Sequence, residues 1–363
     1  MPVTVVLLLL VGLLVAALLT WRWRHFSYFR RIGIPGPKPN LIWGNMMEYH
    51  STDIYKVIGG WIEKYGDTLG FYNGDVPFVV TMDLDLIEKV NVRDFKNFTY
   101  RGLTMMLDKL HPIVGQSIIH VGGSRWKSIR NSVASGFSAT KLKLLMPLIE
   151  QDVEILLEVL KDHATSGFEV DMLKKFEQLS MDFIARGSFG IDERFQGRPD
   201  HPFAAIARSA CSKLMAGRLH MIAQCTTCFG SLMKPLSWFS LIMADVDMMA
   251  KQMAKVIEIR KRDPAFRKPD ILQNLLDAEY VERKMISENG RGAWGMGNSR
   301  ALNIEEVKTS AATLFVAGYE TTATALSYLA YFLAKYPDVQ EKVRQEVDDI
   351  VGNQVSEREC GTG

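Results

Sequence analysis

The chain opens with an apolar segment that changes abruptly to basic and aromatic residues. Val3 to Thr20 contains no charged side chain, and Trp21-Arg22-Trp23-Arg24 follows directly. About 20 apolar residues cross a bilayer, and the run is longer than the roughly 7–15 apolar residues of a secretory signal peptide. The pattern predicts an uncleaved transmembrane anchor over residues 1–24, with a cleaved signal peptide as the alternative. The positively charged flank places the rest of the chain in the cytosol.

A second apolar pattern, near the C-terminus, predicts a long helix. The run from Val307 to Ala334 is almost uninterrupted Ala, Leu, Phe, Val and Thr, and Asn303 and Glu306 precede it at the spacing of a capping pair. A helix that is apolar nearly all round is expected in the middle of a large core. One face carries polar and small residues at three- and four-residue spacing, namely Thr313, Ala317, Glu320, Thr321 and Thr324.

The remaining periodicities predict a mainly α chain with a small β lobe. Helices are expected over residues 53–65, 141–161, 173–187, 241–262 and 337–351, and short strands over 68–72 and 77–81. Between the anchor and these elements lies Pro35-Gly36-Pro37-Lys38-Pro39. Alternating prolines cannot continue a helix, so this segment is expected to be a stiff spacer.

Composition narrows the classes of protein. With 363 residues, 47% of them hydrophobic, the chain can form one large domain or two modest ones beyond the anchor. Lys and Arg exceed Asp and Glu by only 43 − 41 = 2, which gives no ground for a nucleic-acid partner. Four cysteines without regular spacing exclude a disulfide framework. Cys225 and Cys228 form one isolated pair that lacks the second half of a zinc site.

The candidate chemistry lies on the long helix, in Ala317-Gly318-Tyr319-Glu320-Thr321-Thr322. Ala317 and Gly318 remove side-chain bulk, so a flat group can approach the backbone, although Gly inside a helix costs about 1 kcal/mol relative to Ala. Glu320 beside the hydroxyl of Thr321 could relay protons from solvent into a dry cavity. The alternative is that Thr321 bonds back to the Ala317 carbonyl while Glu320 faces a basic neighbour.

A second candidate pair is Trp126 and Arg130, which stand four residues apart and so share one helix face. An indole N–H beside a planar guanidinium suits the binding of carboxylates. A core tryptophan with a surface arginine is the simpler alternative.

The hexapeptide on its long apolar helix resembles the oxygen-activating helix of the microsomal cytochromes P-450, which are haem-thiolate monooxygenases, and most closely their family-3 type. The resemblance covers nearly the whole chain and implies the cytochrome P-450 fold, with residues 25–363 forming a partial catalytic domain. It implies that Thr321 and Glu320 deliver protons in catalysis, that Ala317 and Gly318 form the oxygen-binding groove, and that Trp126 and Arg130 bind the haem propionates.

The same resemblance implies the cofactor, the reaction and the partners. The cofactor is haem, and the reaction inserts one oxygen atom from O2 into an apolar small molecule. Electrons come from an NADPH-dependent reductase. The expected location is the endoplasmic reticulum membrane, with a single pass through the lipid bilayer.

The chain departs from the family at the iron ligand. The family holds iron with a cysteine thiolate in a Phe-x-x-Gly-x-x-x-Cys-x-Gly loop. Around Cys360, position 353 is Asn instead of Phe and position 362 is Thr instead of Gly, so Cys360 is rejected and no metal-ligating residue is assigned. Glu341 and Arg344 match the family's Glu-x-x-Arg pattern formally but are expected to form an exposed ion pair.

This departure predicts a C-terminally truncated, inactive member that lacks the haem-ligand region. The alternatives are a non-catalytic, membrane-tethered binding or regulatory protein and an unstable fragment.

Overall fold

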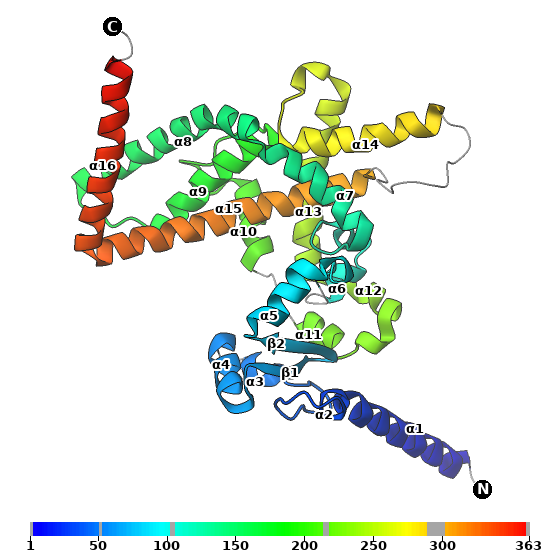
Figure 1. Ribbon diagram of the computed structural model, residues 1–363. Coiled ribbons are helices and arrows are strands. Elements are labelled where there is room, and N and C mark those ends of the chain that lie inside the picture. The colour runs from blue at the N-terminus through cyan, green and yellow to red at the C-terminus, as the bar shows by residue number, and fades with distance from the viewer. Residues whose placement is uncertain (1–2, 51–52, 102–105, 213–217, 289–301, 361–363) are drawn as a thin grey trace. The chain divides into compact units, whose positions relative to one another are not determined.

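The structure is a computed structural model that describes residues 3–50, 53–101, 106–212, 218–288 and 302–360 (Figure 1). The chain forms two compact units. The first contains Met1–Asn131, Ser212–Lys251 and Ala278–Ser310, and the second contains Ser132–Cys211, Gln252–Asp277 and Ala311–Gly363.

The first unit is built from short helices around one β-hairpin. Its elements are α1 (Val3–Phe26), α2 (Tyr28–Arg31), α3 (Met46–His50), α4 (Ile54–Tyr65), β1 (Thr68–Asn73), β2 (Val76–Thr81), α5 (Leu84–Glu88), α6 (Met106–Leu110), α11 (Arg218–Gln224) and α12 (Lys234–Ser237), together with most of α7 (Gly123–Ala134). Among the described helices, only α1 is long and apolar enough to cross a bilayer, and none of its apolar window is buried. The predicted N-terminal apolar helix is therefore present.

The hairpin pairs β1 with β2 in antiparallel register, from Thr68 opposite Thr81 to Asn73 opposite Val76. Its turn needs glycine at position 74, which has φ +62°. A Cβ atom there would lie 2.5 Å from the Gln224 carbonyl oxygen, so the turn packs directly on the end of α11. Both predicted strands are confirmed.

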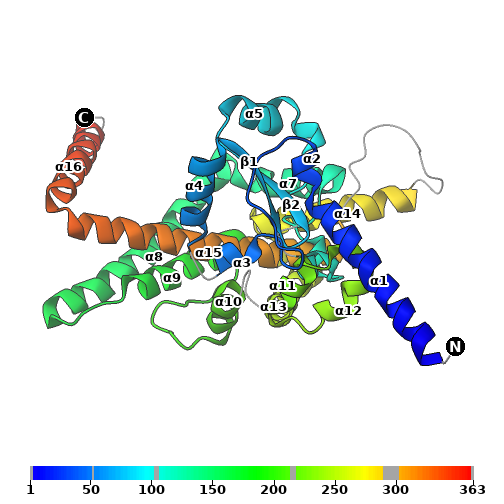
Figure 2. The same cartoon turned by 90° about the horizontal axis from the view of Figure 1, so that it is seen from below.

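The second unit is helical. It contains α8 (Ala139–Ser166), α9 (Met172–Phe183) with its π-helical extension η5 (Ile184–Ser188), most of α10 (Pro202–Ser212), and α16 (Pro337–Cys360). Three further helices, α13 (Leu241–Arg262), α14 (Ile271–Glu288) and α15 (Ile304–Lys335), contribute residues to both units. Leu156 of α8, Phe176 of α9 and Ala323 of α15 form one buried cluster. The three helices accordingly run side by side in both views (Figure 2).

Helix α15 begins as the sequence predicts. The Asn303 backbone N–H donates to the Glu306 carboxylate at 2.8 Å, and the Glu306 N–H donates to the Asn303 side chain at 2.9 Å. These two bonds are the reciprocal pair of a capping box. Arg125 of α7 also pairs with the buried Glu306 carboxylate, which ties the start of α15 to the first unit's own helix.

The expectation that the long helix is buried nearly all round holds for only part of it. Phe315, Tyr319 and Ala323 are buried, but Tyr328 and Phe332 near its end are at least half exposed. The reason is that α8 and α9 cover one face of the helix, whereas the aromatic side chains of its last turns pack on one another and on Tyr336.

The other predicted helices are also present. Residues 53–65 form α4 with Asp53 as its N-cap, and residues 241–262 form α13. The predicted helix over residues 337–351 extends further, to Cys360. A mainly α chain with one small sheet is therefore confirmed.

Candidate functional site

A cavity of about 390 Å³ lies beside α15 within the second unit. Most of its lining is apolar, and the helix contributes Leu314, Ala317, Gly318 and Thr322. The opposing walls come from the start of α8, from the junction of α9 with η5, and from the residues before and at the start of α14. They comprise Gly136, Phe137, Lys141, Leu142, Leu145, Phe183, Ile184, Gly187, Ser188, Pro269, Asp270 and Ile271.

The two charged groups on the wall are held by neighbours. The Lys141 ammonium donates to the Asn274 side-chain oxygen at 2.7 Å. The Asp270 carboxylate pairs with Arg260, whose guanidinium also donates to the Phe189 carbonyl at 2.7 Å. Because these groups are engaged on the outside, the space offers mainly apolar contacts, as a cavity for an apolar molecule must.

Gly318 is the point of closest approach in this wall. A Cβ atom at position 318 would lie 2.6 Å from Cδ1 of Ile184. Ile184 starts the π-helical turn η5, and the wider turn directs its side chain onto the α15 backbone. Glycine therefore allows Ile184 to pack closely on the α15 backbone, which is one physical reason for a residue that weakens an isolated helix.

The predicted catalytic pair lies next to the cavity rather than in its wall. The Thr321 hydroxyl donates to the Ala317 carbonyl at 2.7 Å, and its side chain is exposed. Glu320 is also exposed. Successive residues of a helix point about 100° apart, so Thr322, one residue further, is the threonine that reaches the cavity.

Glu320 acts electrostatically on another acid, Glu177. Burial raises the pKa of the Glu177 carboxyl, and the Glu320 carboxylate raises it further. Arg208 approaches Glu177 at 4.0 Å and acts in the opposite direction. Among the described residues, Glu320 forms no ion pair.

Trp126 and Arg130 lie on α7 in the first unit. The Trp126 ring is half-buried and packs edge-on against Phe95, with ring centroids 5.8 Å apart. Arg130 is exposed and forms no ion pair with any described residue. The guanidinium and the indole N–H therefore have no partner among the residues that the structure describes.

Several wall residues were missed by sequence reasoning. Leu142, Leu145, Phe183 and Ile184 are ordinary apolar residues on helices, and nothing in their spacing separates wall from core. The π-helical turn η5 marks this wall, since such turns often occur at functional sites. The turn is visible in the backbone and not in the sequence, so it could not have identified these residues beforehand.

Comparison with known proteins supports the resemblance. Residues 34–360 match the family described as cytochrome P450. The chain belongs to the cytochrome P450 family. It is 30% identical to rat thromboxane-A synthase over 95% of this chain and 67% of that protein. It is also 30% identical to rat cytochrome P450 3A2, over 90% of this chain and 61% of that one, and 29% identical to cytochrome P450 6B1 of Papilio polyxenes, over 95% and 67%.

Membership of the family implies a haem cofactor, and the residues present fit that group in part. The free donors of Trp126 and Arg130 suit its carboxylates, and the small Ala317 leaves the wall of the cavity open. Neither of the cysteines whose side chains are described, Cys225 and Cys228, lies in the lining of the cavity beside α15. The side chain of Cys360 lies outside the described residues.

Proposed function

We propose that this chain supplies the oxygen and substrate side of a haem-dependent monooxygenase that inserts one oxygen atom from O2 into an apolar small molecule. The observation that supports this most strongly is the apolar cavity lined by Ala317 and Gly318 on a helix whose next turn carries Thr321. Haem, when bound, supplies the binding and activation of O2.

Each candidate residue has a role that follows from its own chemistry. Arg130 and Trp126 hold the carboxylates of the cofactor by charge-assisted and N–H hydrogen bonds. Ala317 leaves room next to the helix. The Thr321 hydroxyl, now bonded to the Ala317 carbonyl, becomes a proton donor when its side chain rotates. Glu320, exposed to water, can reload that hydroxyl.

The test is a titration of the full chain with haem, followed by absorbance. Arg130→Gln should weaken binding at least about tenfold, since a hydrogen bond to a charged group contributes about 1.5–3 kcal/mol. Lys127→Gln removes an exposed charge from the same helix and should have no effect. Equal weakening by both variants would refute the role of Arg130.

We further propose that residues 1–363 by themselves do not form a thiolate-ligated haem. The reduced protein should not show the long-wavelength carbon monoxide band that cysteine ligation produces. If the band appears and Cys360→Ser abolishes it, Cys360 is the ligand and this part of the proposal is wrong. If haem does not bind but apolar small molecules do, a tethered binding protein is the better assignment.

The location and partners belong to the same proposal. Helix α1 is taken as a single-pass anchor in the endoplasmic reticulum membrane, with the bulk of the chain on the cytosolic side, where an NADPH-dependent reductase supplies electrons. The support is the positive charge that follows α1. Protease added to sealed microsomes should digest everything beyond about residue 24. Protection of a large fragment would reverse the topology.

A further inference from the structure

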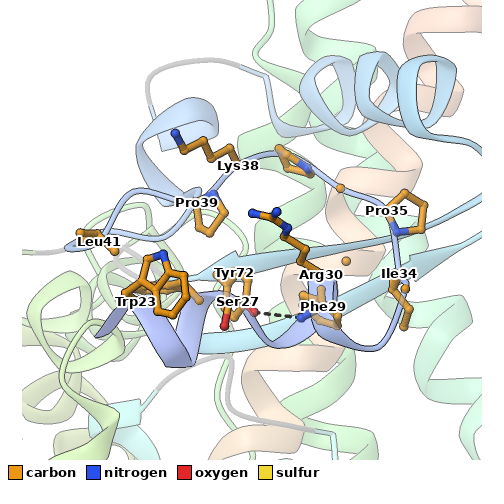
Figure 3. A pocket seen from close by; sticks show the side chains of 15 residues that line it. Trp23, Ser27, Phe29, Arg30, Ile34, Pro35, Lys38, Pro39, Leu41 and Tyr72 are labelled. Carbon is orange, nitrogen blue, oxygen red and sulfur yellow. Dashed lines mark hydrogen bonds between the residues drawn. The ribbon is translucent and has the colours of Figure 1, made fainter. Parts of the chain in front are cut away.

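A second cavity, of about 770 Å³, lies in the first unit where α1, the proline-rich segment and β1 meet (Figure 3). It begins at Trp23, near the end of the apolar helix, and extends along the proline-rich segment, residues 35–39, to Leu41. Its walls include Trp23, Phe26, Phe29, Arg30, Lys38 and Tyr72.

The end of α1 is fixed to the hairpin, so the cavity has a defined shape. Arg22 forms an ion pair with the buried Asp75 carboxylate at 2.5 Å and donates to the carbonyls of Leu41 and Ile42, each at 2.7 Å. His25 bonds to the Asp75 carbonyl at 2.7 Å. These bonds bracket the cavity from the side of the helix.

The floor is an aromatic cluster. Tyr72 is buried against Phe26 and Phe29 at ring distances of 4.9 and 5.1 Å, and its hydroxyl accepts from the Phe29 N–H. The proline-rich segment is held to β1, the strand that carries Tyr72, because the Gly70 N–H donates to the Pro35 carbonyl at 2.8 Å. The proline-rich segment is therefore docked on β1 and forms a wall.

The charged groups in the lining are both positive. Arg30 and Lys38 are its only charged residues, both are exposed, and neither side chain forms a hydrogen bond or ion pair with another described residue. Figure 3 shows the Arg30 side chain extending toward the part of the proline-rich segment that carries Lys38 and Pro39. No Asp or Glu occurs in the sequence before Glu48. Glu48 and Lys38 line a neighbouring cavity together, but no described carboxylate forms an ion pair with Arg30 or Lys38.

This combination specifies the ligand. Guanidinium and ammonium groups select phosphate oxygens, whereas the aromatic floor and the proline rings, which lack N–H donors, select hydrocarbon. A molecule that carries both is an anionic amphiphile. The cavity adjoins the end of a helix with the length and apolarity of a membrane span, and the ligand of this chemistry at that position is a membrane lipid.

We propose that the cavity binds one acidic glycerophospholipid, with its phosphate against Arg30 and Lys38 and the upper part of its acyl chains against Trp23, Phe26 and Phe29. The inference rests on the proposed membrane anchoring by α1 but not on haem chemistry. A single bound lipid would fix the orientation of the first unit at the membrane surface.

The test places the full chain in phosphatidylcholine vesicles that contain a small fraction of phospholipid brominated on its acyl chains. Bromine quenches nearby tryptophan, and the difference between the wild type and Trp23→Phe isolates the signal of Trp23. Each cation facing acidic lipid contributes roughly fivefold in affinity. Brominated phosphatidylserine should therefore quench Trp23 at least tenfold more effectively than brominated phosphatidylcholine.

Charge-matched variants separate the cavity from diffuse attraction. Arg30→Gln/Lys38→Gln should remove the preference for phosphatidylserine. Arg24→Gln/Arg31→Gln removes the same charge at the same level of the chain but outside the lining, and should retain it. Equal loss in both double variants, or equal quenching by the two lipids, would overturn the site.

Two further outcomes would also overturn it. Relief of quenching by soluble glycerophosphoserine would show a site for free anions instead of lipid. Failure of the wild type to enter vesicles of phosphatidylcholine alone would remove the proposed anchor, and the haem titration would then decide independently whether the monooxygenase proposal survives.

Discussion

The C-terminal end of α1 and helix α16 each carry an arginine bound to a carboxylate, yet the two ion pairs contribute differently to the fold. The side chains of Arg22 and Asp75 are 11% and 2% exposed, and they join residues 53 positions apart. Arg344 and Glu341 are 60% and 49% exposed and lie three positions apart on one helix. The first pair fixes the end of α1 on the hairpin, because water cannot reach these buried side chains to take the place of either partner. The second supports only the helix that carries it.

The largest expected effect comes from breaking the buried pair. Asp75→Ala leaves Arg22 without its counter-ion and should lower the stability of the hairpin by about 3–5 kcal/mol. Backbone amide exchange in β1 and β2 measures this locally, which suits a chain of two units better than one global transition. Asp348→Ala removes the exposed partner of Arg344 and serves as the control. Similar effects of the two variants would show that burial does not separate the pairs.

A pH titration extends the comparison to a buried histidine. Burial lowers the pKa of His120 to about 4, and the positive charge of Lys109 adds to the shift. The folded chain then binds fewer protons than the unfolded chain between about pH 4 and 6.5. Its stability is complete above pH 6.5 and falls as the pH decreases through that window, by up to about 3 kcal/mol.

His120→Asn should flatten this dependence, because it removes the imidazole that titrates. The variant should still pack at this position, since an amide oxygen can accept from the Ser117 hydroxyl that now lies 2.7 Å from Nδ1. His50→Asn, at an exposed position, should leave the pH profile of hydrogen exchange unchanged. A slope that survives in His120→Asn would assign the acid sensitivity to other groups.

A glycine pair probes packing at the same hairpin. Gly74→Ala forces a side chain into a left-handed conformation and against the Gln224 backbone, and should destabilise by about 2 kcal/mol. Gly60→Ala lies inside α4, where a Cβ atom would meet nothing within 4 Å, and should stabilise by about 0.5–1 kcal/mol. Thermal unfolding midpoints that move in the same direction would contradict this account.

The smallest effect is expected at Arg344→Gln. The Arg344 guanidinium binds Glu341 and Asp348 in water, and solvent takes over both contacts when it is removed. The thermal midpoint should not change, and the helical signal should fall only at very low salt. A clear loss of stability would mean that α16 is held by more than its own turns.

The start of α15 shows how far local pattern reaches. Asn303 and Glu306 stand three residues apart, and the capping box they form could be predicted because all of its atoms lie within one turn. The hairpin, α4 and the exposed Glu341–Arg344 pair were predictable for the same reason. Each depends on residues that are close in sequence, where backbone geometry leaves few alternatives.

The sequence by itself determined the apolar α1, the mainly helical fold and the family, because these depend on periodicity and on a hexapeptide read in order. Only the tertiary structure decided that Ile184 fills the space above Gly318, that Thr322 rather than Thr321 reaches the cavity, and that Arg30 and Lys38 share a cavity with Trp23. Those contacts join residues whose separation along the chain carries no signal, and packing alone brings them together.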